Sequence, residues 1–135
     1  MDPTFRLRIV TPSRQVVTED VEEAQVPGKE GYLGILPGHT PLISELKPGE
    51  LTYRQGQQTR RLAVSGGFVE VLPDQVTILA ETAERAEEID AERARAAKER
   101  AERQLRSPHP DVDINRAAVA LERALIRLQV AMRGR

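Results

Sequence analysis

Arginine supplies most of the basic side chains in this sequence. Of the 20 basic residues, only Lys29, Lys47 and Lys98 are lysines. The guanidinium group of arginine is planar, permanently charged and suited to binding phosphate or carboxylate groups. The two histidines, His39 and His109, are far apart in the sequence and show no spacing typical of metal ligands. The sequence therefore predicts no metal site, and the arginines are candidates for contacts with anionic groups.

Residues arranged for catalysis are not evident in the sequence. There is no cysteine. There is no serine and histidine pairing of the hydrolase kind, and no glycine-rich phosphate loop that ends in lysine. We therefore expect the chain to have no catalytic site of its own.

Two sets of charged residues have a spacing that suggests a binding role. Arg93 follows Asp90 by three residues in a segment with helical periodicity, which is also the spacing of an ordinary surface ion pair worth a few tenths of a kcal/mol. Arg116, Arg123 and Arg127 recur on one side of a second helical segment. Such a stripe is usually solvated, and here it is also a candidate docking edge for an acidic partner surface.

Composition indicates a globular protein. The chain has 135 residues, of which 39% are hydrophobic and 30% are charged, with a formal net charge of -1. Near-neutral charge argues against a dedicated nucleic-acid-binding protein. The absence of cysteine fits a reducing compartment, no apolar run approaches a membrane span of about 20 residues, and the start lacks a signal-peptide pattern. These features predict a cytoplasmic location.

Alternating apolar and polar residues predict strands in the first part of the chain. Gly31 and Pro41 delimit a segment that favours a strand, a tight loop and another strand. Pro73 occupies the favoured second position of a turn, so the strands on either side of it should pair antiparallel. Many short strands indicate a β-sandwich or barrel. The other expected strands are residues 5–9, 15–19, 21–26, 50–54, 59–64, 68–72 and 76–80.

Apolar residues recur every three or four positions from about Thr82 onward, which predicts helix. Thr82 is the expected N-cap of a first helix that runs to about Arg106. Ser107–Pro110 should end it, because proline cannot donate to a helix. Asp111 or Asp113 should cap a second helix. Two helices joined by a short loop form an antiparallel hairpin.

The predicted fold class is therefore α+β. An N-terminal antiparallel β-sandwich of residues 1–84 is followed by a C-terminal two-helix antiparallel hairpin of residues 85–135. The two helices should pack unequally, because alanine buries far less surface than leucine. Marginally stable elements are the ones that move. The expected packing face of the second helix comprises Ile114, Ala117, Ala118, Leu121, Leu125, Leu128 and Met132, and that of the first comprises Ala83, Ala86, Ala94, Ala97 and Ala101.

Five ordered motifs, which together span most of the chain, resemble the epsilon subunit of bacterial F-type rotary ATP synthases. They lie at residues 33–42, 47–49, 64–71, 89–94 and 123–128. The resemblance implies a non-catalytic regulatory subunit peripheral to the cytoplasmic face of the bacterial cell membrane, with no nucleic-acid partner. Its sandwich would bind the gamma subunit of the central stalk and the ring of c subunits. Its hairpin would fold on the sandwich or extend to the catalytic alpha and beta subunits, and the extended form would block ATP hydrolysis.

The resemblance also implies a regulatory site for ATP in the folded hairpin. Asp90 could orient Arg93 there or accept a hydrogen bond from adenine or ribose. On a straight helix, however, Arg123 and Arg127 point away from the groove of Asp90, so ATP would lie at the edge of the hairpin or the helix would twist. Tyr32 and His39 would face the c ring, and Arg116 would join Arg123 and Arg127 in the docking stripe. The implied ATP-binding residues are Glu84, Ile89, Asp90, Arg93, Ala94, Arg100, Arg123 and Arg127.

Two other functions fit the sequence less well. A free-standing β-domain with a basic helix could bind an acidic or nucleic-acid partner, and its RNA binding would then be sensitive to salt. Capture by the stalk gamma subunit would instead support the ATP synthase interpretation. A small β-barrel enzyme is the third possibility, and it lacks catalytic residues.

Overall fold

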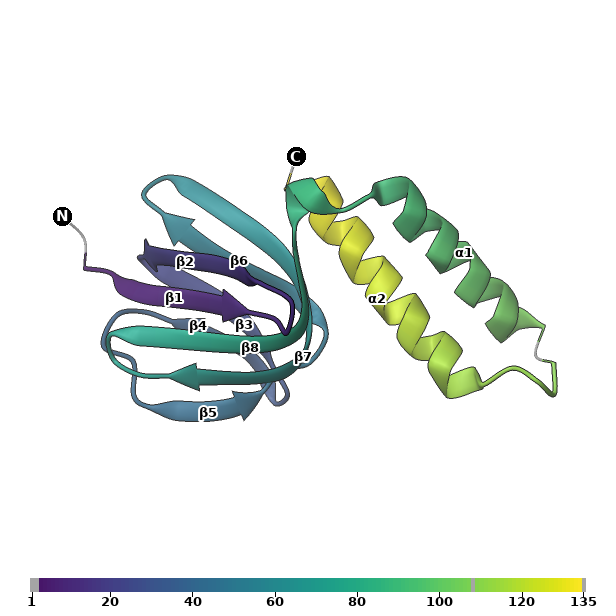
Figure 1. Cartoon of the computed structure of the whole chain (residues 1–135), viewed down its shortest axis with the longest axis horizontal. Coiled ribbons are helices and arrows are strands. Elements are labelled where there is room, and N and C mark those ends of the chain that lie inside the picture. Colours follow the sequence, from purple (N-terminus) through teal and green to yellow (C-terminus); the bar gives the residue numbers. More distant parts are fainter. Residues whose placement is uncertain (1–2, 108, 135) are drawn as a thin grey trace.

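The computed structural model describes residues 3–107 and 109–134, which form a β-sandwich followed by two helices. Figure 1 shows the helical hairpin projecting from one end of the sandwich, away from the N-terminus. The predicted fold class is confirmed. Pro108, part of the predicted helix-breaking segment, lies outside the described residues.

Strands in the described part of the chain pair in the order β2-β1-β8-β7-β6-β3-β4, and β5 pairs with β7. All of these pairs are antiparallel except β1 with β8, which run parallel with Ile9 opposite Ile78. The strands are β1 (Phe5–Val10), β2 (Gln15–Val21), β3 (Glu23–Gly28), β4 (Gly31–Ile35), β5 (Leu42–Glu45), β6 (Gly49–Gln55), β7 (Gln58–Val71) and β8 (Gln75–Arg85).

Alternation of side chains fills the interior of the sandwich, because successive residues of a strand point to opposite faces. Leu7, Ile9, Leu51 and Leu62 are fully buried, and Tyr53 is the largest buried side chain. The core therefore forms from strands distributed over the whole first part of the chain.

One long strand, β7, replaces the two strands expected at residues 59–64 and 68–72. Gly66 and Gly67 in its middle have positive φ angles of 69° and 94°. These glycines let the strand bend without ending. A Cβ atom at Gly67 would lie only 1.8 Å from the carbonyl oxygen of Leu79, so only glycine fits there.

The expected start of the first helix at Thr82 is wrong. Thr82 lies within β8, opposite Ser65, and the strand continues to Arg85 because Ala83 faces the core. A short 3-10 turn, η1 (Ala86–Glu88), follows, and α1 (Ala91–Arg106) begins after Asp90. Asp90 is the actual N-cap, since its carboxylate accepts the backbone N–H of Arg93 at 3.1 Å.

The second helix, α2 (Ile114–Arg133), begins at the N-cap Asp113, one of the two predicted caps. The expected leucine face is wrong in part. Ala117 is buried and Leu121 and Leu128 are half-buried, but Leu125 is 46% exposed and Met132 is 79% exposed. Small residues are buried instead, since alanines let the two backbones approach closely and the end of α2 must also contact the sandwich. Ala83 and Ala86 lie outside α1, and the buried alanines of the two helices are Ala94, Ala101, Ala117, Ala124 and Ala131.

We predict that Gly67→Ala destabilises the sandwich by about 3 kcal/mol or more, because the new methyl group overlaps the backbone of β8. Gly56→Ala is the matched control. Gly56 also has a positive φ, of 60°, but a Cβ atom there meets nothing within 4 Å. The control should lose only about 1 to 2 kcal/mol. Urea unfolding of both variants measures the difference, and equal losses would contradict this account of β7.

Candidate functional site

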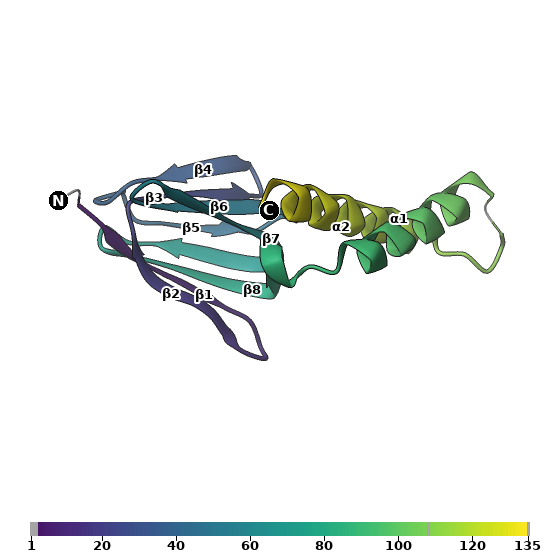
Figure 2. The same cartoon turned by 90° about the horizontal axis from the view of Figure 1, so that it is seen from above.

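The end of α2 attaches the hairpin to the sandwich. Val130 and Ala131 of α2 are buried against Ala63 of β7, Ala86 of η1 and Ile89, and Ile126 packs against the same cluster. In Figure 2, α2 adjoins the sandwich along its last turns, and α1 lies beside α2. The apolar attachment is therefore small and consists mostly of short side chains.

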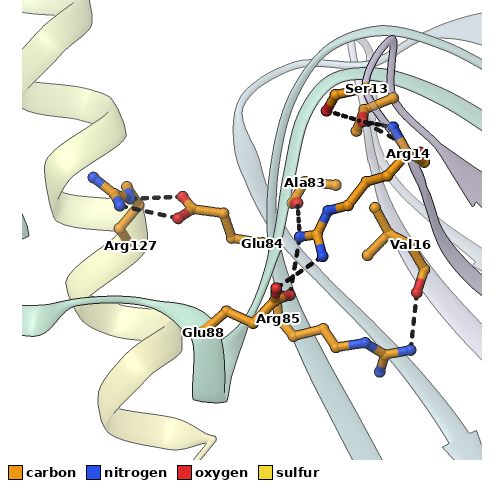
Figure 3. Close-up of polar contacts among 9 residues, drawn as sticks. Ser13, Arg14, Val16, Ala83, Glu84, Arg85, Glu88 and Arg127 are labelled. Atoms are coloured by element: carbon orange, nitrogen blue, oxygen red, sulfur yellow. Dashed lines mark hydrogen bonds and ion pairs between the residues drawn. The ribbon is translucent and has the colours of Figure 1, made fainter.

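An ion pair between Glu84 of β8 and Arg127 of α2 reinforces this attachment. Arg127 Nε lies 2.7 Å from Glu84 Oε1, and Arg127 Nη2 donates to Glu84 Oε2 at 3.0 Å. Figure 3 shows the two side chains meeting across the gap between strand and helix. Both side chains are about two-thirds buried, with 26% and 33% exposed. The pair is therefore screened less by solvent than a surface ion pair.

A cavity of about 180 Å³ lies beside this ion pair. Arg123 lines it together with Glu84 and Arg127, and the hydroxyl groups of Ser65 and Thr82 contribute to its wall. The cavity thus offers cationic, anionic and hydroxyl groups in one place. Such a set can bind a ligand that carries both phosphate and hydrogen-bond donors.

Glu50 forms a second polar tie between the sandwich and α2, and sequence analysis did not find it. Its side chain is 6% exposed and pairs with Arg61. Its carboxylate also accepts a hydrogen bond from Gln129 Nε2 at 2.9 Å and lies 3.6 Å from Arg133 Nη1. Alternation in β6 gave no sign of this role, because Gln129, the partner of Glu50 on α2, lies 79 positions away in the sequence.

A second cavity, of about 450 Å³, lies between the two helices near their connecting loop. Arg100 of α1 and Arg116 of α2 both line it, with Gln104, Asp111 and Asp113. Neither guanidinium group has an ion-pair partner among the described residues. The cavity therefore presents two free cations from opposite helices.

The eight implied ATP-binding residues do not form one cluster. Glu84, Arg123 and Arg127 share the first cavity, and Arg100 lines the second. Ile89 and Ala94 are buried, at 2% and 0% exposed. Asp90 caps α1 through the backbone of Arg93, whose own side chain is exposed. The regular spacing of Arg116, Arg123 and Arg127 on α2 links the two cavities along one side of the hairpin.

Tyr32 and His39 contact different parts of the sandwich. The Tyr32 hydroxyl donates to the carbonyl oxygen of Glu50 at 2.8 Å, at the start of β6 and near the end of α2. His39 lies four residues beyond the end of β4, in a loop that the backbone N–H of Gly38 ties to Pro73 O at 2.8 Å. The two residues therefore do not form one loop surface.

Two further arginines hold the segment that leads into the hairpin, and sequence analysis missed them. Arg14, in the β1–β2 turn, forms a bidentate ion pair with Glu88 at 2.9 and 3.1 Å (Figure 3). This hydrogen bonding lowers the pKa of the Glu88 carboxyl group, so Glu88 is ionised at neutral pH. Arg85 donates to Val16 O at 3.0 Å and to the Tyr53 hydroxyl at 3.1 Å. Burial raises the pKa of that Tyr53 phenol.

The fold and the motif order together define a two-part class of protein, a β-sandwich with a helical hairpin. Residues 4–86 match the family model for the ATP synthase delta/epsilon chain β-sandwich domain, and residues 87–132 match that for its long α-helix domain. The chain belongs to this family. Among its relatives are ATP synthase epsilon chains of Syntrophobacter fumaroxidans (53% identical over 131 residues, 97% of this chain and 98% of the relative) and Bacillus licheniformis (53% over 128 residues, 95% and 98%).

Solved structures agree with the family. A chain in the Euglena gracilis mitochondrial ATP synthase, in an assembly described as OSCP/F1/c-ring, matches with a TM-score of 0.82 and 29% identity, over 98% of this chain and 84% of that chain. A chain in the Tetrahymena thermophila mitochondrial ATP synthase central stalk and c-ring has the same fold, with a TM-score of 0.57 and 16% identity, over 98% of this chain and 96% of that chain.

Neither of the helices in residues 3–107 and 109–134 is long and apolar enough to cross a membrane. Within the same residues, no three acidic or histidine side chains gather closely enough to hold a metal ion.

We predict that Glu84→Gln loosens α2 from the sandwich, because Arg127 then remains partly buried without its anionic partner. Loss of a charged hydrogen bond of this kind costs about 1 to 3 kcal/mol. Amide hydrogen exchange should accelerate in α2 and stay unchanged in the core of β7. Glu92→Gln is the matched control, because Glu92 pairs with Arg95 on the surface of α1 and is 86% exposed. Equal acceleration in both variants would contradict a special role for Glu84.

Proposed function

We propose that this protein is a non-catalytic subunit of the central stalk of a bacterial F-type ATP synthase, at the cytoplasmic face of the membrane. In this proposal it couples the gamma subunit to the c ring and inhibits ATP hydrolysis when its hairpin extends toward the catalytic alpha and beta subunits. ATP binds the folded hairpin and favours that non-inhibitory state. The supporting observation is the narrow attachment of the hairpin, which the last turns of α2 provide.

The attachment between hairpin and sandwich buries little apolar surface, which suits a hairpin that moves between a folded and an extended state. The apolar cluster holds three alanines and adds little burial at about 0.8 kcal/mol per buried CH₂. A ligand that binds only the folded hairpin stabilises it by about 2.7 kcal/mol at a concentration one hundred times its Kd. Such a shift can move an equilibrium between states of similar free energy. A hairpin held by a large leucine-rich interface would stay folded with or without the ligand.

The distribution of arginines supports a polyphosphate as that ligand. Arg123 and Arg127 line the cavity beside the sandwich, and Arg100 and Arg116 line the cavity between the helices. The two cavities lie along one side of α2, so an elongated anion there would contact both helices. ATP would then bridge α1, α2 and Glu84, which stabilises the folded arrangement of all three.

An exposed apolar surface on the sandwich supports docking to the stalk. Phe68 of β7 and Leu79 of β8 face each other across the strand pair and are 53% and 55% exposed. Ile43 of the adjacent β5 is 71% exposed. Contiguous exposed apolar residues of this kind mark interaction sites. We assign this surface to the gamma subunit.

We predict that removal of residues 89–135 raises ATP hydrolysis by the assembled ATP synthase severalfold, because the element that blocks the catalytic subunits is gone. The sandwich should still assemble, since its core does not include the helices. ATPase assays of complexes with full-length and shortened chains measure the effect. Capture of the shortened chain by the gamma subunit is the control for assembly, and unaltered hydrolysis in an assembled complex would contradict the inhibitory role.

We further predict that Arg93→Ala weakens ATP binding to the isolated full chain about tenfold or more. Arg93 precedes Arg100 by seven residues on the same side of α1, so in the proposed site it donates a charged hydrogen bond to phosphate. Asp90→Asn tests the neighbouring carboxylate while it keeps an N-cap acceptor for α1. Arg95→Ala is the control, because Arg95 lies on the opposite side of the helix. Calorimetric titration measures all three, and unchanged affinity of the Arg93 variant would end the nucleotide-site proposal.

A further inference from the structure

We infer that Arg14 in the β1–β2 turn fixes the pivot of the hairpin at Ile89–Asp90, so that the chain up to Glu88 stays with the sandwich when the helices move. This inference rests on the proposed mobility of the hairpin and adds the point about which it turns. It assigns a positioning role to a residue 74 positions away from its partner in the sequence.

The contacts of Arg14 reach two successive parts of the connecting segment. One guanidinium nitrogen lies 2.9 Å from Glu88 Oε2, and the other donates to Glu88 Oε1 at 3.1 Å and to the carbonyl oxygen of Ala83 at 3.4 Å. Glu88 Oε1 also accepts the backbone N–H of Arg85 at 3.0 Å. A single cation thus ties the end of β8 and the turn η1 to the β1–β2 turn, and Figure 3 shows these side chains together.

Arg85, at the end of β8, also binds this connecting segment to the sandwich. Its backbone still pairs with Leu62 of β7, and its side chain reaches Val16 O on β2 and the Tyr53 hydroxyl on β6. Its guanidinium is also 3.8 Å from the Glu19 carboxylate. Residues 83–88 are therefore bound to β2, β6, β7 and the β1–β2 turn by bonds that do not involve the helices. Their contacts with α2 are the Glu84–Arg127 ion pair and the packing of Ala86.

The chain changes partner immediately after Glu88. Ile89 is 2% exposed and packs with Val130 and Ala131, which belong to the hairpin, as well as with Ala63 and Ala86. Asp90 is exposed, has extended φ and ψ angles of -82° and 100°, and bonds forward to Arg93. A rotation about Ile89 and Asp90 would break the Glu84–Arg127 ion pair and separate the hairpin from the sandwich, and it would leave every bond of Arg14 and Arg85 intact.

Amide hydrogen exchange of the isolated full chain tests the inference. In the unsubstituted chain, the amides of residues 83–88 should exchange as slowly as those of central β7, while the helices exchange faster. Arg14→Gln should accelerate exchange at residues 83–88 about tenfold, because two charged hydrogen bonds are lost. Glu88→Gln keeps the acceptor for Arg85 and should give a similar change.

The matched control is Arg6→Gln. Arg6 of β1 forms an ion pair with Asp20 of β2 at 2.9 Å on the surface of the same two strands, away from the connecting segment. This variant should leave exchange at residues 83–88 unchanged. The double variant of Arg14 and Glu88 should be no worse than either single variant, because both remove the same interaction.

A second measurement separates this inference from the proposed function. The chain has no cysteine, so spin labels placed at Ser107→Cys and Thr18→Cys report the distance from the hairpin tip to the sandwich. A distance that never changes with ATP contradicts the mobile hairpin, and the exchange experiment still tests the tie. Equal exchange in the Arg14 and Arg6 variants, or exchange of residues 83–88 together with the helices in the unsubstituted chain, overturns the inference.

Discussion

The ion pair between Glu84 and Arg127 is the interaction on which the placement of the hairpin depends. It joins the last strand of the sandwich to the last helix of the chain, 43 residues later, and lies beside a small cluster of alanines, valine and isoleucine. Glu50 adds a second acidic contact to the same helix. Two carboxylates and a few short side chains therefore decide whether the helices stay with the sandwich.

Prediction from the sequence succeeded where local periodicity dominates the fold. Alternation found the sandwich, because buried side chains on strands must recur at every second residue. It failed at the ends of elements. β8 continues past Thr82 because Ala83 still fills the core, and Asp90 supplies a better cap than Thr82. Two strands were expected at residues 59–64 and 68–72, but the positive φ angles of Gly66 and Gly67 let a single strand bend between them.

The site residues also divide into those that local periodicity predicts and those that only the tertiary fold brings together. The spacing of Arg116, Arg123 and Arg127 was visible in the sequence because helical periodicity places them on one side. Glu50 and Arg14 could not be found in the same way. Glu50 meets Gln129 over 79 positions and Arg14 meets Glu88 over 74, so only the tertiary fold brings these partners together. No local pattern distinguishes either residue from an ordinary surface charge.

The exposed leucine side of α2 bears on how readily the molecule changes shape. Ile114, Leu125 and Met132 already face water while the helices are paired, at 44%, 46% and 79% exposed. The hydration of these three residues would therefore change little if the helices separated, whereas Leu121 and Leu128 are half-buried. Together with Ala118, Leu121 and Leu128, the exposed Ile114, Leu125 and Met132 have the 4-3-4-3-4 spacing of a heptad seam. One side of α2 thus has the apolar spacing of a coiled-coil seam, and three of its residues remain exposed to solvent in the folded protein.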